Sequence, residues 1–150
     1  NKNQIENIEK IIIKDLNGEI ILEKLDSTWT INQSDSLLIK ERVLDNFFNR
    51  VLKVKQENII TEKIEKYIKY GVDDSTGIHV TLMSQNDEKL ASYIFGRAKA
   101  FGYMRYKNQP QVYLINDNIS YMLNSRIDYW GEPPIQDVPL PVQTQESNSN

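Results

Sequence analysis

His79 is the only histidine in the chain, and cysteine is absent. These counts exclude disulfides, thiol catalysis, Cys-based metal centres and sites built from several histidines, and we expect no His-dependent triad. His79 alternates with Ile78 and Val80, so its side chain falls on the outward face of a predicted strand. We therefore expect a solvated or loosely hydrogen-bonded imidazole there.

Carboxylates and hydroxyls could supply the ligands of a hard cation at residues 73–76 (DDST). This run lacks the glycine and glutamate positions of a calcium loop, and a turn between a helix end and a strand explains it fully. Glu6, Glu9, Glu19 and Glu23 alternate with apolar residues, which is typical of solvated strand faces. No two acids can be paired as general acid and base, so we expect neither a metal site nor catalytic residues.

A short basic stretch, residues 96–102 (GRAKAFG), has the glycines and cations of an anion loop. Its spacing differs from G-x-x-x-x-G-K-[ST], so it does not point successive backbone N–H groups at a phosphate. We expect a connection between two strands. Arg97 and Lys99 are still the best candidates in the chain for contact with an acidic partner.

Aromatic side chains recur on the adjacent strands predicted after residue 90. Ordinary cross-strand packing accounts for them, and the alternative is a surface platform for a glycan or a peptide. The aromatic residues are Tyr93, Phe95, Phe101, Tyr103, Tyr106 and Tyr113. With the basic residues of the same region, the candidate partner-binding set is Arg97, Lys99, Tyr103, Arg105 and Tyr106.

Composition limits the kinds of partner. A chain of 150 residues with 39% apolar residues fits one domain with a real core. Its net charge of −3 argues against nucleic-acid binding driven by phosphate neutralisation. Apolar runs are too short to span a bilayer, and no residue pattern calls for a cofactor.

The elements that must position these residues follow from periodicity. Strands are predicted at residues 5–13, 20–22 and 28–31, with Asn17-Gly18 as a type I′ turn. Apolar residues then recur at helical spacing over 37–52, after candidate N-caps at residues 34–36. This helix should pack its aromatic stripe against a sheet.

A second β region follows a short helix near 62–69, in which Ile64, Tyr67 and Ile68 share a face and Gly71 adopts the left-handed conformation at the end. Strands are predicted at 77–83, 90–95, 101–106 and 111–115, then a short helix at 118–125 that Asp117 can cap. The sequence therefore predicts an α+β domain, residues 1–130, with an antiparallel sheet made of two β-meanders. The Pro-rich residues 131–150 should be an extended linker or a disordered tail.

The order of several short motifs resembles the DUF4340 family. The motifs are a Trp29-Thr30-Ile31 strand, Ser34-Asp35 before the helix, Tyr70-Gly71-Val72, Ile94-Phe95-Gly96, Tyr103-Met104-Arg105 and the Val-Tyr-Leu-Ile strand at 112–115. The resemblance covers residues 5–130. Ser34 and Val72 stand where the family pattern has Ala and Leu.

This resemblance implies an extracytoplasmic bacterial domain tethered by a transmembrane helix outside this chain, in some members beside ABC-type transport components. It implies no catalytic residues. We expect a non-enzymatic scaffold or interaction module with protein partners in the cell envelope. The alternative is a ligand-binding domain for an envelope glycan or peptide, which requires a concave apolar pocket with a few polar groups. An enzyme would need carboxylates brought together by the fold, and an edge strand offered to a partner is a further route.

Overall fold

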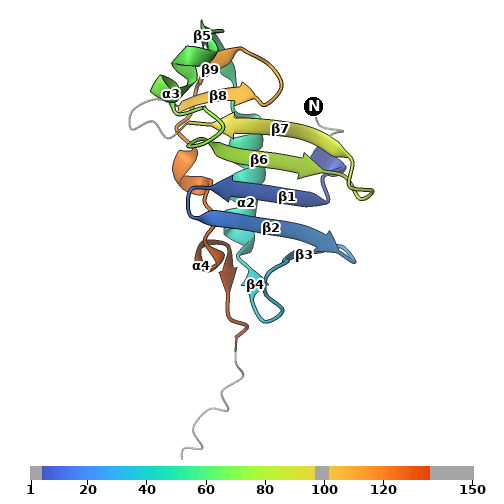
Figure 1. Cartoon of the computed structure of the whole chain (residues 1–150). Coiled ribbons are helices and arrows are strands. Elements are labelled where there is room, and N and C mark those ends of the chain that lie inside the picture. Colours follow the sequence, from blue (N-terminus) through green and yellow to red (C-terminus); the bar gives the residue numbers. More distant parts are fainter. Residues whose placement is uncertain (1–4, 97–101, 136–150) are drawn as a thin grey trace, which may run out of the picture.

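The computed structural model describes residues 5–96 and 102–135 of the chain (Figure 1). Within them, eight strands form one antiparallel sheet in the order β3-β2-β1-β6-β7-β8-β9-β5. The strands are β1 (Lys10–Asp15), β2 (Gly18–Leu25), β3 (Thr28–Ile31), β5 (Gln56–Thr61), β6 (Ile78–Met83), β7 (Lys89–Phe95), β8 (Gly102–Tyr106) and β9 (Val112–Ile115). The pairing of β1 with β6 joins the two meanders into this one sheet.

One face of the sheet carries the main core. Side chains alternate across a strand, so β6 buries Ile78, Val80 and Leu82 on the same face. Helix α2 (Glu41–Arg50) lies behind the sheet and crosses its strands (Figure 1). Its buried Phe47 belongs to the same apolar cluster as these strand residues. Burial of such side chains, each worth about 1.5–3 kcal/mol, holds α2 on the sheet.

The opposite face, called here the outer face, carries a smaller core at the β7–β8–β9 end. Ile94 and Phe95 are both buried although they are neighbours in β7, so they point to opposite faces. Phe95 belongs to the α2 cluster, whereas Ile94 packs with Val72 and Val112. The outer face is therefore covered at one end of the sheet and open over its middle strands.

The segment after β9 returns along the domain to close the main core. A 3-10 helix η3 (Ser120–Met122) and a short helix α4 (Ile127–Trp130) bring Trp130 to full burial. Its indole Nε1 donates to the carbonyl of Asn124 at 2.9 Å, and its ring lies 6.1 Å from that of Phe47. This C-terminal segment is part of the fold.

The predicted fold class is confirmed. The structure has the antiparallel sheet, the two meanders and the amphipathic helix packed on one face. The alternation predicted for residues 77–83 appears as the burial pattern of β6. Gly71 has φ 70° and ψ 19°, the left-handed conformation predicted for it.

The main helix is shorter than the predicted range 37–52. Leu38 and Ile39 form β4 (Leu38–Ile39), which pairs with β10 (Gly131–Glu132), and the helix begins only at Glu41. Ser34 does not cap it; its Oγ accepts the N–H of Leu37 at 3.2 Å. After Arg50 the chain tightens into a 3-10 helix, η1 (Val51–Lys53).

Strand β5 was not predicted, because its sequence, QENIIT, is mostly polar and carries no alternation. After it, η2 (Ile64–Lys66) and α3 (Tyr67–Tyr70) stand in place of the one helix predicted near 62–69. Strand β5 forms one edge of the sheet and pairs with β9 through two register shifts, each a bulge or irregularity. Such bulges discourage the addition of a further strand.

The hairpin predicted at Asn17-Gly18 is present, but its turn differs. Asp15 pairs with Gly18, so the loop residues are Leu16 and Asn17, and neither has a positive φ. The type I′ signature appears one hairpin later, at residues 26–27, where φ is 49° and 68°. The helix predicted at 118–125 is reduced to the 3-10 helix η3, and Asp117 pairs with Arg50 at 2.9 Å without capping it.

The predicted domain boundary at residue 130 falls between α4 and β10. Gly131 and Glu132 pair with Ile39 and Leu38. Most of the predicted tail, 136–150, lies outside the described residues. In the described part of the chain, no helix is both long enough and apolar enough to cross a membrane.

Candidate functional site

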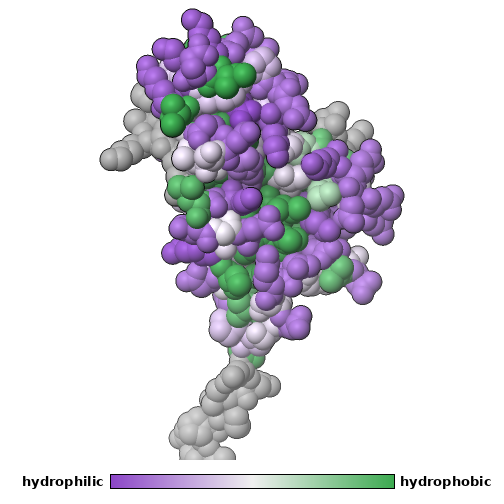
Figure 2. Space-filling view, viewed as in Figure 1, coloured by the Kyte–Doolittle hydropathy of each residue, from purple (hydrophilic) through white to green (hydrophobic). Residues whose placement is uncertain are grey.

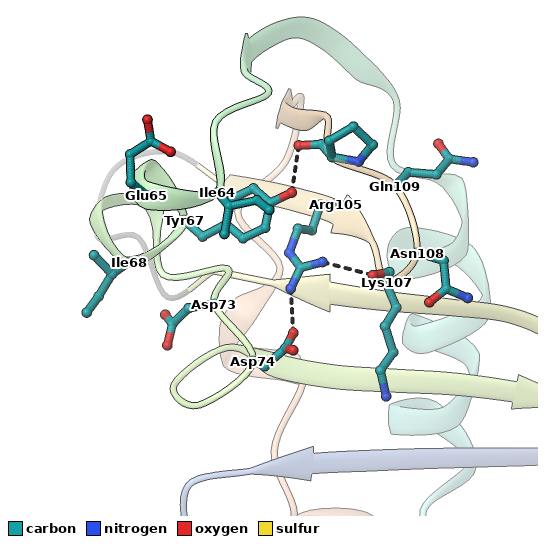
Figure 3. A pocket seen from close by; sticks show the side chains of 11 residues that line it. Ile64, Glu65, Tyr67, Ile68, Asp73, Asp74, Arg105, Lys107, Asn108 and Gln109 are labelled. Atoms are coloured by element: carbon teal, nitrogen blue, oxygen red, sulfur yellow. Dashed lines mark hydrogen bonds and ion pairs between the residues drawn. The ribbon is translucent and has the colours of Figure 1, made fainter.

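A cleft of about 550 Å³ opens between the η2–α3 segment and the turn that joins β8 to β9 (Figure 3). We call it the Arg105 cleft. Ile64 and Ile68 bound one side, residues 107–110 bound the other, and Asp74 stands at one end. Arg105 lies in the middle, beside Tyr67 (Figure 3).

Arg105 is the buried charge of this cleft, with 4% of its surface exposed. Its Nε donates to the carbonyl of Val72 at 2.7 Å, and Nη1 donates to the carbonyl of Lys107 at 3.0 Å. Nη2 reaches the Asp74 carboxylate at 2.5 Å. The guanidinium also lies over the ring of Tyr67, 4.3 Å from its centroid. One side chain thus ties β8 to the loop after α3.

Tyr67 anchors the other wall of the cleft. It is the buried residue of α3, and its hydroxyl donates to the carbonyl of Pro110 at 2.9 Å. The left-handed Gly71 ends the helix and lets the Val72 N–H return to the carbonyl of Tyr67 at 3.0 Å. The two walls are therefore joined beneath the opening.

Gly96 permits the close approach that seats α3 on the sheet. A Cβ at this position would lie 2.1 Å from the carbonyl oxygen of Tyr70, the last residue of α3. The obstacle is backbone, so the helix itself would have to move. We expect Gly96→Ala to lower the free energy of unfolding by about 1–3 kcal/mol, measured by urea denaturation. Ser75→Ala, at an exposed position in the neighbouring loop, should stay within about 0.5 kcal/mol. Equal stability of both variants would show that the approach is not tight.

The two aspartates at the end of the cleft are engaged differently. Burial acts to raise the pKa of Asp73, but hydrogen bonds from Thr76 and the backbone N–H of Ser75 outweigh it and hold the pKa below its ordinary value. Asp73 therefore stays ionised and shapes the turn at residues 73–76, as the sequence indicated. Asp74 pairs with Arg105 while its own side chain remains 75% exposed.

The apolar side of the cleft faces water. Ile64 is 73% exposed and Ile68 is 71% exposed, whereas Tyr67 between them is buried. The sequence placed these three residues on one helix face, but the turn from η2 to α3 separates them. Two neighbouring isoleucines that stay uncovered give the cleft an apolar surface that gains by burial against a partner.

A second hollow, of about 410 Å³, lies on the outer face over β1 and β6. His79 lines it, as the outward position in β6 predicts. Its Nε2 is 2.8 Å from the carbonyl oxygen of Asp74. His79 thus takes the outward position, but it is half-buried and holds a well-formed hydrogen bond where a solvated or loosely bonded ring was expected.

Two of the aromatic residues in the alternative of a surface platform, Tyr103 and Tyr106, lie on opposite faces of the sheet. Tyr103 contacts the outer-face cluster and lies 4.9 Å, centroid to centroid, from Tyr70. Tyr106 packs on the α2 side with Tyr93, 5.3 Å away. Tyr93 and Tyr106 are partners across β7 and β8, whereas Tyr103 packs against Tyr70 of helix α3. Burial raises the pKa of Tyr93. A platform that contains both Tyr103 and Tyr106 is not formed.

The basic loop was predicted to connect two strands and to contact an acidic partner through Arg97 and Lys99. Both residues lie outside the described residues, as does Phe101. Of the three candidate partner-binding residues that the structure describes, Tyr103, Arg105 and Tyr106, only Arg105 lines the cleft. Among the residues that the structure describes, no three His, Asp or Glu side chains are grouped so as to hold a metal ion.

Several residues of the cleft were not singled out from the sequence. Ile64 and Ile68 come from a segment far from Arg105 in the sequence, and they meet it only because α3 packs beside β8. Pro110 lies in the turn directly after β8. A pair of isoleucines at i and i+4 with lysine and glutamate between them was the available signal. It indicates a buried helix face as readily as an exposed wall.

Comparison with family models identifies a match over most of the chain. Residues 5–140 match the model of a family described as a domain of unknown function, DUF4340. Neither the curated proteins nor the solved structures contain a significant match to the chain.

Proposed function

The chain belongs to the DUF4340 family, and we propose that it is a non-enzymatic interaction module. In this proposal the Arg105 cleft holds a segment of a partner protein. The proposed module works outside the cytoplasm, in a membrane-tethered protein of the bacterial envelope, as an accessory to an ABC-type transport system. The location and the transport role are expectations carried by the family resemblance.

The observation that carries the proposed binding role is the exposed apolar wall beside a braced polar floor. Ile64 and Ile68 are mostly exposed, although they stand next to a concave surface. Arg105 and Tyr67 form the floor of the cleft, and both donate hydrogen bonds to backbone carbonyls of the protein. These bonds make the floor rigid. A preformed site of this kind loses little entropy when a partner binds.

A pull-down from the native envelope tests this proposal. The wild-type chain and Leu25→Asp, which alters a 53% exposed leucine at the far end of β2, should recover the same partner. The double variant Ile64→Asp/Ile68→Asp should lose it, because two carboxylates replace the apolar wall. Both isoleucines are exposed, so we expect the fold to survive, with unchanged circular dichroism. Equal recovery by all three proteins would contradict the proposal.

A second candidate function is the binding of an envelope glycan or peptide that is passed to a transporter. The size of the cleft favours it, since about 550 Å³ lies within the roughly 300–1,000 Å³ typical of ligand sites. A library of envelope glycan fragments and short peptides, screened by thermal denaturation, separates the two functions. A ligand of the cleft should raise the melting temperature of the wild type and leave that of Ile64→Asp/Ile68→Asp unchanged.

A further inference from the structure

The hollow over β1 and β6 lies on the outer face, the face toward the viewer in Figures 1 and 2. Figure 2 shows hydrophobic patches there, enclosed by hydrophilic surface. Ile12, Thr81 and Met83 line the hollow from two neighbouring strands, and none of them is fully buried. This part of the sheet has no helix over it among the described residues.

The hollow and the Arg105 cleft share two lining residues, Asp74 and Lys107. Asp74 links them directly, because its carboxylate pairs with Arg105 in the cleft and its carbonyl oxygen meets His79 in the hollow. Lys107 gives its carbonyl to Arg105, while its ammonium side chain is exposed. The two concavities therefore adjoin, and we call them together the outer-face groove.

Charge is distributed unevenly along this groove. Lys14, Lys89 and Lys107 line the hollow, are exposed, and have no carboxylate within ion-pair distance in the described part of the chain. Two of the acids that line the hollow are already engaged. Asp74 pairs with Arg105, and Asp15 accepts hydrogen bonds from the Asn17 N–H and the Ser125 hydroxyl. The third acid, Glu19, stands directly opposite Lys14 in the pairing of β1 with β2. Three lysines and three carboxylates therefore line the hollow, and because Arg105 takes up the charge of Asp74, one positive charge remains in excess.

We propose that the outer-face groove binds one extended polypeptide segment, with aliphatic residues in the Arg105 cleft and acidic residues over the hollow. The inference rests on the proposed function and extends it to a second contact region. A polypeptide supplies aliphatic and anionic groups within one chain. Nucleic acid would supply phosphates but no aliphatic side chains, and the net charge of −3 opposes it.

Short linear random peptides displayed on phage provide the probe. Peptides selected on the whole chain should combine aliphatic residues with a cluster of Asp or Glu. A fluorescein-labelled winner is then titrated by fluorescence anisotropy against Lys14→Glu/Lys89→Glu. We expect roughly tenfold weaker binding at low salt and a smaller difference at high salt, because exposed ion pairs are individually weak and screened.

The matched control is Lys53→Glu/Lys55→Glu, which makes the same change of charge at two exposed lysines that do not line the groove. Its affinity should stay within about twofold of the wild type, since no ion pair to the segment is lost. Loss of affinity in Ile64→Asp/Ile68→Asp alone would leave the cleft as the site and refute the groove. Insensitivity to both variants, or a selection that enriches no peptide, would refute the groove and the cleft together. Binding on a glycan array without peptide enrichment would overturn the assignment to polypeptide.

Discussion

Replacement of Trp130 by alanine should lower the free energy of unfolding by about 4 kcal/mol, within the range of large-to-small substitutions at buried aromatic sites. The side chain has no exposed surface, and its ring packs against Phe47 and Tyr129. Loss of the indole also removes the Nε1 donor, which leaves the Asn124 carbonyl without its hydrogen bond. Urea denaturation followed by circular dichroism measures the change.

Ile135→Ala is the control for Trp130→Ala, because Ile135 lies five residues further along and is 96% exposed. It should change stability by no more than about 0.5 kcal/mol. If Trp130→Ala is as stable as Ile135→Ala, the segment from η3 to β10 does not contribute to the core.

Arg105→Ala should cost about 3 kcal/mol. The substitution removes three charge-assisted hydrogen bonds and the stacking on Tyr67, and it opens a gap beneath the cleft. Asp74 is exposed enough to be hydrated once it is alone, so little of this cost comes from a stranded carboxylate. Asp74→Asn should cost less, since Arg105 keeps its two carbonyl partners.

Arg126→Ala serves as the comparison for Arg105→Ala. Arg126 forms an ion pair with Asp128 at 3.9 Å, and both side chains are mostly exposed, so the expected cost is below about 0.5 kcal/mol. Equal costs at the two arginines would mean that the brace at Arg105 is not structural. The cleft would then lack the rigid floor on which the proposed function depends.

Local patterns predicted the centre of the fold better than its edges. The alternation in β6 and the left-handed Gly71 are dictated by neighbouring residues, and both were predicted correctly. Strand β5 has a polar sequence and owes its conformation to pairing with β9. Helix α2 begins late because Leu38 and Ile39 pair with residues 131–132, and no local window contains that information.

The candidate site shows the same division. Arg105 was among the residues predicted to bind a partner, yet its contacts to Val72 and Asp74 depend on tertiary structure. The separation of Tyr103 from Tyr106 follows from a rule of sequence, because residues three apart in a regular strand face opposite sides. Applied to β8, that rule argues against a shared platform.

The pairing of β1 with β6 has a consequence for the order of folding. These strands lie far apart in the sequence, with β2, β3, α2 and β5 between them. Closing so long a loop is slow, because the chain loses conformational entropy before the contacts between the two strands can form. During synthesis the first meander leaves the ribosome long before β6 exists. Until then, β1 has an unpaired edge, and Ile11 and Ile13 await the apolar neighbours that β6 brings.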